Sequence, residues 1–191
     1  TLDRSSAASD VYKRQDDVRA FNFVDYPPVI HPVDIYAAPA AARVVRKDYD
    51  YAFEEEKYRG APDIRLHEID VARPLEIAGE RIVPVSGHHS ERFEVTGYRI
   101  GRMAYLTDFK TIADAEVGKL IGVELLVVNA LRFRPHPSHF NVEEALALIA
   151  RVAPRRALIT HVSHEIGRHA ATTALLPRGV ELAYDGLEII I

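Results

Sequence analysis

The residues of this chain best suited to chemistry are histidines, and most of them lie in its second half. The 191-residue sequence contains nine histidines and no cysteine. Without thiolates, a divalent ion could be held only by imidazole and carboxylate groups. Seven of the histidines follow residue 87: His88, His89, His136, His139, His161, His164 and His169. We interpret His31, His67 and His169 as ordinary surface or structural residues.

Several of the other histidines, and one aspartate, stand where a predicted strand ends. They are His88 and His89 after residues 83–85, Asp108 after residues 104–107, His136 and His139 after residues 125–128, and His161 and His164 after residues 158–160. Loops at strand ends bring distant residues together in α/β folds, so we expect a shared site. His88 and His89 are adjacent, so on a strand they point to opposite faces and at most one binds a metal directly.

The apolar pattern predicts strands that would position this site. Alternation favours strands at residues 33–36, 64–69 and 81–85, and a hairpin of residues 96–100 with 103–107. Residues 124–128 are apolar apart from the first, which is typical of a strand buried on both faces. Residues 180–183 and 187–190 predict a closing pair of strands around Gly186, with Asp185–Gly186 as a hairpin turn.

Helices complete a predicted mixed α/β fold. Residues 142–152 place apolar side chains on one helical face, and Asn141 with Glu144 predicts a capping box at its start. Together with strands at residues 125–128 and 157–160, this helix makes a β-α-β unit. A short helix is predicted at residues 40–46 and a weak one at residues 17–23.

Composition limits the function classes. The formal net charge of −4 argues against a protein whose main task is to bind nucleic acid. No membrane-spanning run or signal peptide is recognised, so we expect a cytoplasmic protein without a membrane partner. We expect one domain over residues 16–191, preceded by a disordered or non-native tail at residues 1–15. A homodimer is left open.

Four stretches carry a resemblance to a known family: GYRIGRMAYLTD, LRFRPHPSHFNVEEALALI, LITHVSHEIG and LAYDGLEI. In this order they resemble blocks of the metallo-β-lactamase superfamily. They are most similar to the branch that contains cyclic phosphodiesterases of phosphonate breakdown and relatives of the tRNA 3′-end processing endonuclease. The resemblance implies an αββα sandwich that holds two divalent ions, zinc or manganese.

The resemblance also implies roles for individual residues. His89 (or, alternatively, His88), Asp108 and His161 match metal ligands, with Asp108 as the carboxylate that bridges both ions. His139 matches a histidine that faces the substrate and could protonate the leaving group. His136 and His164 are weaker candidates for contacts to the substrate or to the ligands. Such a site activates water for attack on a phosphodiester or another small substrate.

The sequence departs from the family in one respect, because the superfamily's H-x-H-x-D-H motif does not occur in it. We therefore expect an N-terminally truncated, partial sandwich that lacks the first strands. Two hypotheses follow: the parent protein is a metal-dependent hydrolase that cleaves phosphodiesters, or this chain is a non-catalytic remnant or interaction domain that keeps the fold. Only a chain restored with the motif should turn over phosphodiesters. An RNA-binding module is disfavoured by charge.

Overall fold

The chain divides into two compact units, Thr1–Asp70 and Val71–Ile191. The computed structural model describes residue 22 and residues 32–57 and 61–191. The predicted tail at residues 1–15 lies outside the described residues, as do His31 and all but one residue of the weak helix predicted at residues 17–23.

The first unit contains a small parallel β-α-β arrangement. Strand β1 (Val33–Ala37) pairs in parallel with β2 (Ile64–Glu68). Helix α2 (Pro39–Asp48) and the 3-10 helix η1 (Asp50–Ala52) lie between them in the chain. The strands and the short helix predicted here are confirmed. His67 has the structural role expected of it, since its Nε2 lies 2.7 Å from Asp34 Oδ1 and its ring stacks on Tyr36.

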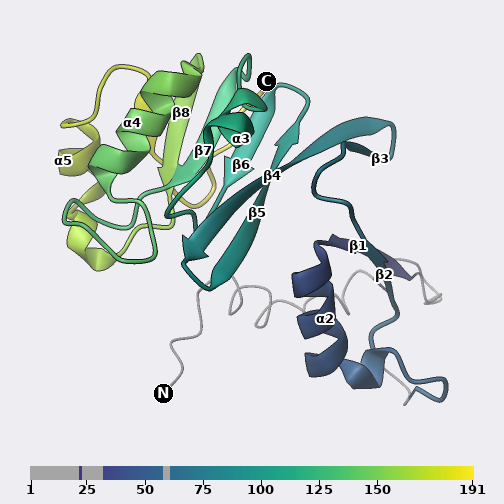
Figure 1. The fold of residues 1–191 in the computed structure, drawn as a ribbon. Helices are drawn as coiled ribbons and strands as arrows, with labels where there is room; N and C mark the ends of the chain where they lie inside the picture. The colour runs from purple at the N-terminus through teal and green to yellow at the C-terminus, as the bar shows by residue number, and fades with distance from the viewer. Residues whose placement is uncertain (1–21, 23–31, 58–60) are drawn as a thin grey trace. The chain divides into compact units, whose positions relative to one another are not determined.

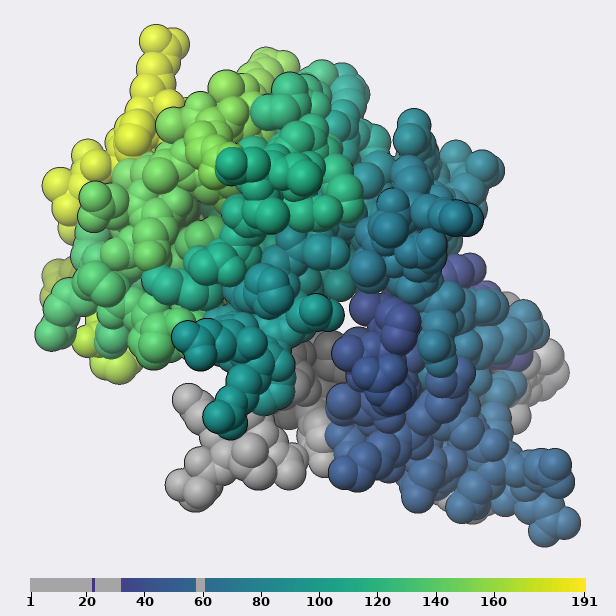
Figure 2. Space-filling model, in the orientation of Figure 1, coloured from purple at the N-terminus to yellow at the C-terminus, as the bar shows by residue number. Residues whose placement is uncertain are grey.

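The second unit is built on a seven-stranded sheet with the order β3-β4-β5-β6-β7-β8-β9 (Figure 1). Its strands are β3 (Leu75–Ile77), β4 (Glu80–Ser90), β5 (Phe93–Ile100), β6 (Met103–Leu106), β7 (Leu125–Asn129), β8 (Arg156–Thr160) and β9 (Val180–Leu182). Neighbours are antiparallel from β3 to β6 and parallel from β6 to β9. The carboxyl ends of β6, β7 and β8 therefore open at the same edge. The turn that joins β4 to β5 projects from the surface (Figure 2).

Four helical segments join these strands: α3 (Asp114–Gly118), α4 (Val142–Val152), the 3-10 helix η2 (His164–Ile166) and α5 (His169–Thr173). Helix α4 has the predicted bounds and capping box: Asn141 Oδ1 accepts from Glu144 N, and Glu144 Oε2 accepts from Asn141 N, both at 2.8 Å. It ends at Ala153, whose left-handed φ of 51° turns the chain before Pro154. Within the described part of the chain, no helix is long and apolar enough to cross a bilayer.

The main core lies between the sheet and the helices α3 and α4, which cover one of its faces (Figure 1). Phe109 is fully buried in it, at 0% exposure. Two glycines make room for this ring: a Cβ at Gly87 would lie 2.3 Å from Phe109 Cε1, and one at Gly97 would lie 3.2 Å from Cε2. The absence of side chains at these two strand positions lets the ring approach the sheet backbone.

The second face of the sheet carries a smaller core that corrects one prediction. Leu125, Val127 and Leu158 are buried there, with Met103, Ala183, Leu187 and Ile189 packed against them. The predicted closing strand pair is wrong: β9 pairs in parallel with β8, and residues 187–190 form no strand. Asp185–Gly186 is a turn, but it joins no hairpin. Apolar and polar residues alternate over 187–189 because Leu187 and Ile189 pack against this face of the sheet.

We expect Gly87→Ala to lower the free energy of unfolding by about 1–3 kcal/mol, because overpacking forces Phe109 or the strand to move. Urea unfolding followed by far-UV circular dichroism measures the change. Gly118→Ala is the matched control, since a Cβ there meets nothing within 4 Å. An equally small effect of both substitutions would show that the ring can shift without cost.

Candidate metal centre

The centre of the candidate site is the carboxylate of Asp108, which is 1% exposed. Asp108 follows β6 and His161 follows β8, on the edge where the parallel strands end. Both residues have left-handed backbone conformations, with φ of 63° and 56°. Such a conformation costs a non-glycine residue about 1–3 kcal/mol and persists where surrounding contacts hold it. Two strand ends, on either side of β7, therefore carry strained residues that face one site.

Asn129 holds the chain immediately after Asp108. It is fully buried at the end of β7, and its side chain bonds both backbone groups of Phe109: Oδ1 accepts from Phe109 N at 2.8 Å, and Nδ2 donates to Phe109 O at 3.0 Å. Sequence analysis did not single this residue out. Its signal was a polar side chain at the end of an otherwise apolar buried strand, a position that requires a hydrogen-bonding partner.

Three imidazole rings surround the Asp108 carboxylate or its backbone. His139 Nε2 lies 3.1 Å and His161 Nε2 lies 3.4 Å from Asp108 Oδ1. His89 Nδ1 donates to the backbone carbonyl of Asp108 at 3.0 Å, which fixes the orientation of that ring. The rings of His89 and His139 meet edge to face, with centroids 4.5 Å apart. Histidines from three other parts of the second unit thus converge on Asp108.

These donors fit a divalent ion. Bonds of about 2.1 Å to a tetrahedral ion place ligand atoms about 3.4 Å apart. The two distances from Asp108 Oδ1 to imidazole nitrogens, 3.1 and 3.4 Å, have this size. Ligand atoms of His89, Asp108 and His139 all lie within 4.8 Å of one another. His139, which we expected to face the substrate, is therefore close enough to be a ligand itself.

The remaining predicted site residues are placed unequally. His136 lies beside His139, with their Nδ1 atoms 3.1 Å apart. His88 is exposed, whereas its neighbour His89 is buried. Of these two alternatives, it is therefore His89 that lies next to Asp108. His164 is exposed on η2. The structure thus assembles His89, Asp108, His139 and His161, with His136 at the side.

Burial and neighbouring charge shift the pKa values of two of these histidines. Burial lowers the pKa of His89, and the charge of His139 lowers it further. Burial also lowers the pKa of His136, followed by the charges of His139 and Arg132. Both rings therefore favour the neutral form, which is the form that can bind a metal.

A charged cluster borders the site on the loop after β7. Glu165 forms an ion pair with Arg132 and a second one, at 3.1 Å, with Arg134. The hydrogen bond from Arg132 lowers the pKa of the Glu165 carboxyl. Because Arg134 is 81% exposed and two guanidinium groups share one carboxylate, the cluster adds positive charge beside the histidines.

Comparison with known proteins agrees with this geometry. Residues 16–162 match the family model of the beta-lactamase superfamily domain, so the chain belongs to the metallo-β-lactamase superfamily. The crystal structure of a diphosphatase from the PhnP family is 32% identical, has a TM-score of 0.80 and is matched over 92% of this chain and 65% of that one. Human tRNase Z, short form, shares the fold at 14% identity with a TM-score of 0.58, over 82% of this chain and 66% of that one. The predicted superfamily and the mixed α/β fold class are confirmed.

A curated relative bears a different name. A protein of Porphyromonas gingivalis called octanoyltransferase is 35% identical over 158 residues, which are 82% of this chain and 32% of that protein. The chain thus spans about a third of this relative's length, and 65% of the length of the diphosphatase structure.

The lowered pKa values predict how stability depends on pH in the metal-free chain. Above pH 6.5, the ordinary histidine pKa, His89 and His136 are mostly neutral in both folded and unfolded states. Below it, the unfolded chain binds protons that the folded chain resists, so the free energy of unfolding falls until the lowered folded pKa is passed. We expect urea unfolding in a chelator to show this loss, and His136→Gln to reduce its slope. Equal slopes for both chains below pH 6.5 would contradict the shift at His136.

Proposed function

We propose that this chain supplies metal ligands and a proton donor to the active site of a metal-dependent hydrolase that cleaves phosphodiesters. His89, Asp108 and His161 bind the metal, and His139 protonates the leaving group. The observation that carries the proposal is the buried Asp108 carboxylate with two imidazole Nε2 atoms at 3.1 and 3.4 Å from the same oxygen. A charge buried to this extent requires cations or donors around it.

Hydrogen bonding supports the role of His139 as a proton donor. Ser138 N donates to His136 Nδ1 at 3.3 Å, so that nitrogen is an acceptor. The proton between the two rings then belongs to His139 Nδ1, which lies 3.1 Å from it. The other nitrogen of His139, Nε2, faces the Asp108 carboxylate. Because both nitrogens of the His139 ring face acceptors, the ring makes both hydrogen bonds only when each nitrogen carries a proton.

The chain's own residues would divide the work as follows. Asp108, His89 and His161 would hold zinc or manganese, the ions that suit imidazole and carboxylate donors. A bound divalent ion would supply charge neutralisation on a phosphoryl oxygen and an acidified water. His139 holds a proton beside this position and can transfer it to a departing oxygen. Arg132 and Arg134 add positive charge at the border, which suits an anionic substrate.

We assign hydrolysis rather than acyl transfer to this chain. The name octanoyltransferase belongs to a relative, and the match covers only 32% of that relative's length. The PhnP-family diphosphatase is matched over twice that share of its length. The convergent histidines and aspartate are donors that metal-dependent hydrolysis uses.

Metal content is the first test. We expect the purified chain, stripped with chelator and dialysed against zinc or manganese, to retain metal at a fixed ratio by elemental analysis. Asp108→Ala and His161→Ala should each weaken retention by more than about tenfold, since even indirect supports of a metal site have effects of this size. His88→Ala is the matched control, because this exposed histidine neighbours His89 and points away. A folded wild-type chain without metal, or full retention in Asp108→Ala, would overturn the assignment.

The role of His139 is tested separately. If His139 is the proton donor, His139→Ala retains metal, whereas a ligand would lose it. In a form of the chain that carries H-x-H-x-D-H ahead of residue 16, hydrolysis should fall by about a hundredfold or more for an alkyl leaving group. The loss should be much smaller for p-nitrophenol, which departs without a proton. Equal losses for both leaving groups would argue that His139 acts on the metal or on binding.

A further inference from the structure

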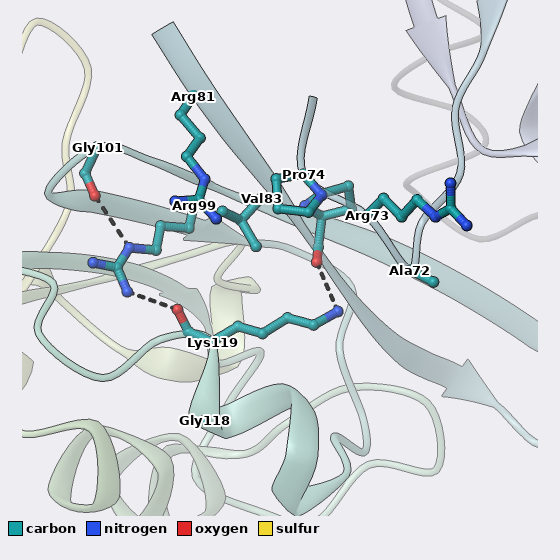
Figure 3. A pocket seen from close by; sticks show the side chains of 10 residues that line it. Ala72, Arg73, Pro74, Arg81, Val83, Arg99, Gly101, Gly118 and Lys119 are labelled. Carbon is teal, nitrogen blue, oxygen red and sulfur yellow. Dashed lines mark hydrogen bonds between the residues drawn. The ribbon is translucent and has the colours of Figure 1, made fainter. Parts of the chain in front are cut away.

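A second polar site lies in the Val71–Ile191 unit, away from the histidines. It is a pocket of about 450 Å³ on the face of the sheet that also carries α3 (Figure 3). Ten residues line it, and four of them are basic while none is acidic: Arg73, Arg81, Arg99 and Lys119. In a chain whose formal net charge is −4, this is a local concentration of positive charge.

Arg99 is fixed in the pocket by neutral groups. Its Nε donates to Gly101 O at 3.1 Å, and its Nη1 donates to Lys119 O at 2.8 Å (Figure 3). Nη1 also donates to Ile121 O at 2.9 Å. All three acceptors are backbone carbonyls, so none carries a charge that balances the guanidinium. Nη2 has no hydrogen-bond partner among the residues that the structure describes. The Arg99 guanidinium is therefore held in place while its Nη2 can still donate hydrogen bonds to a ligand.

Arg81 adds a second guanidinium on the same face. In the β4–β5 register Val83 stands opposite Arg99, which makes Arg81 a diagonal neighbour of Arg99 at about 7–8 Å between backbone positions. Glu76 is opposite Arg81 on β3, yet within residues 32–57 and 61–191 no ion pair involves Arg81. Two like charges this close repel each other, and an anion between them would relieve the repulsion.

The rest of the lining suits a small ligand. Lys119 Nζ donates to Pro84 O at 3.1 Å and pairs with Glu116 at 2.8 Å, so its charge is already partly balanced. Val83, Pro74 and Pro84 offer apolar walls. A Cβ at Gly101 or Gly118 would meet nothing within 4 Å, so the space beside both glycines is open.

We propose that this pocket binds a small phosphate-bearing anion between Arg81 and Arg99. Guanidinium groups match the geometry of phosphoryl oxygens with paired N–H donors, and a fixed guanidinium loses little entropy on binding. The volume of about 450 Å³ is that of a site for a small molecule. A free diphosphate and the phosphoryl group of an ester present the same chemistry here.

The pocket is separate from the candidate metal centre. Arg81 stands near the start of β4 and His89 near its end, eight residues along the strand. At the rise of an extended chain this is about 25 Å. Binding at the pocket is therefore measurable in metal-free protein, and it neither requires nor tests the hydrolase proposal.

The test is calorimetric titration of the chelator-treated chain with inorganic pyrophosphate. We expect saturable binding that weakens as salt is added, because charge dominates it. Arg81→Gln should weaken the affinity by about tenfold or more, the size of one charge-assisted contact. Arg178→Gln is the matched control, since it removes the same charge from an exposed position outside the pocket lining. Arg99 is left intact because its carbonyl contacts hold the fold.

Asp108→Ala separates the two sites, and its pyrophosphate affinity should equal that of the wild-type chain. Three results would overturn the proposal: no saturable binding, equal weakening by Arg81→Gln and Arg178→Gln, or a changed affinity in Asp108→Ala with none in Arg81→Gln. The second would indicate attraction by overall charge, and the third would place the anion at the histidines. A pyrophosphate ester titrated in parallel distinguishes a free diphosphate from a phosphorylated small molecule as the preferred ligand.

Discussion

The structure around the candidate metal centre depends on how the fully buried Phe109 is held. Its backbone N and O are both bonded by the side chain of Asn129, while its ring lies against two glycine positions of the sheet. A backbone so fixed leaves the preceding residue, Asp108, little freedom, and its left-handed conformation follows from that constraint. The chemistry of the carboxylate therefore depends on an amide and an aromatic ring that take no part in it.

Sheet topology brings the histidines to this carboxylate. The parallel strands β6 and β8 end on one edge with Asp108 and His161, and the loop after β7, between them, carries His139. Strand β4 supplies His89 from the antiparallel half of the sheet. The change from antiparallel to parallel pairing at β6 thus joins a long hairpin strand to three strand ends. A sheet of one kind alone would not bring these four side chains together in the same way.

Much of this could be predicted from local sequence, and the failures have physical causes. Capping chemistry is local, so helix α4 and its box at Asn141 were predictable. Which of His88 and His89 enters the site depends on the face that packs on Phe109, which sequence does not show. The polar side chain of Asn129 at the end of a buried strand indicates that it has a partner, but not which one, because a backbone partner has no sequence signature. Residues 187–190 alternate like a strand, but the same alternation serves a segment that only packs its apolar side on a sheet.

One carboxylate joins the start of α4 to the chain that follows Asp108. Glu144 uses Oε2 in the cap with Asn141, and its Oε1 accepts from Lys110 at 2.6 Å. Lys110 N in turn donates to His88 O, on β4 beside His89. A chain that docked α4 in a wrong register would leave the Lys110 ammonium without its counter-charge. Because both side chains are partly exposed, this ion pair contributes at most about 1 kcal/mol, but it favours the position of α4 in which the chain between Asp108 and His89 is also held.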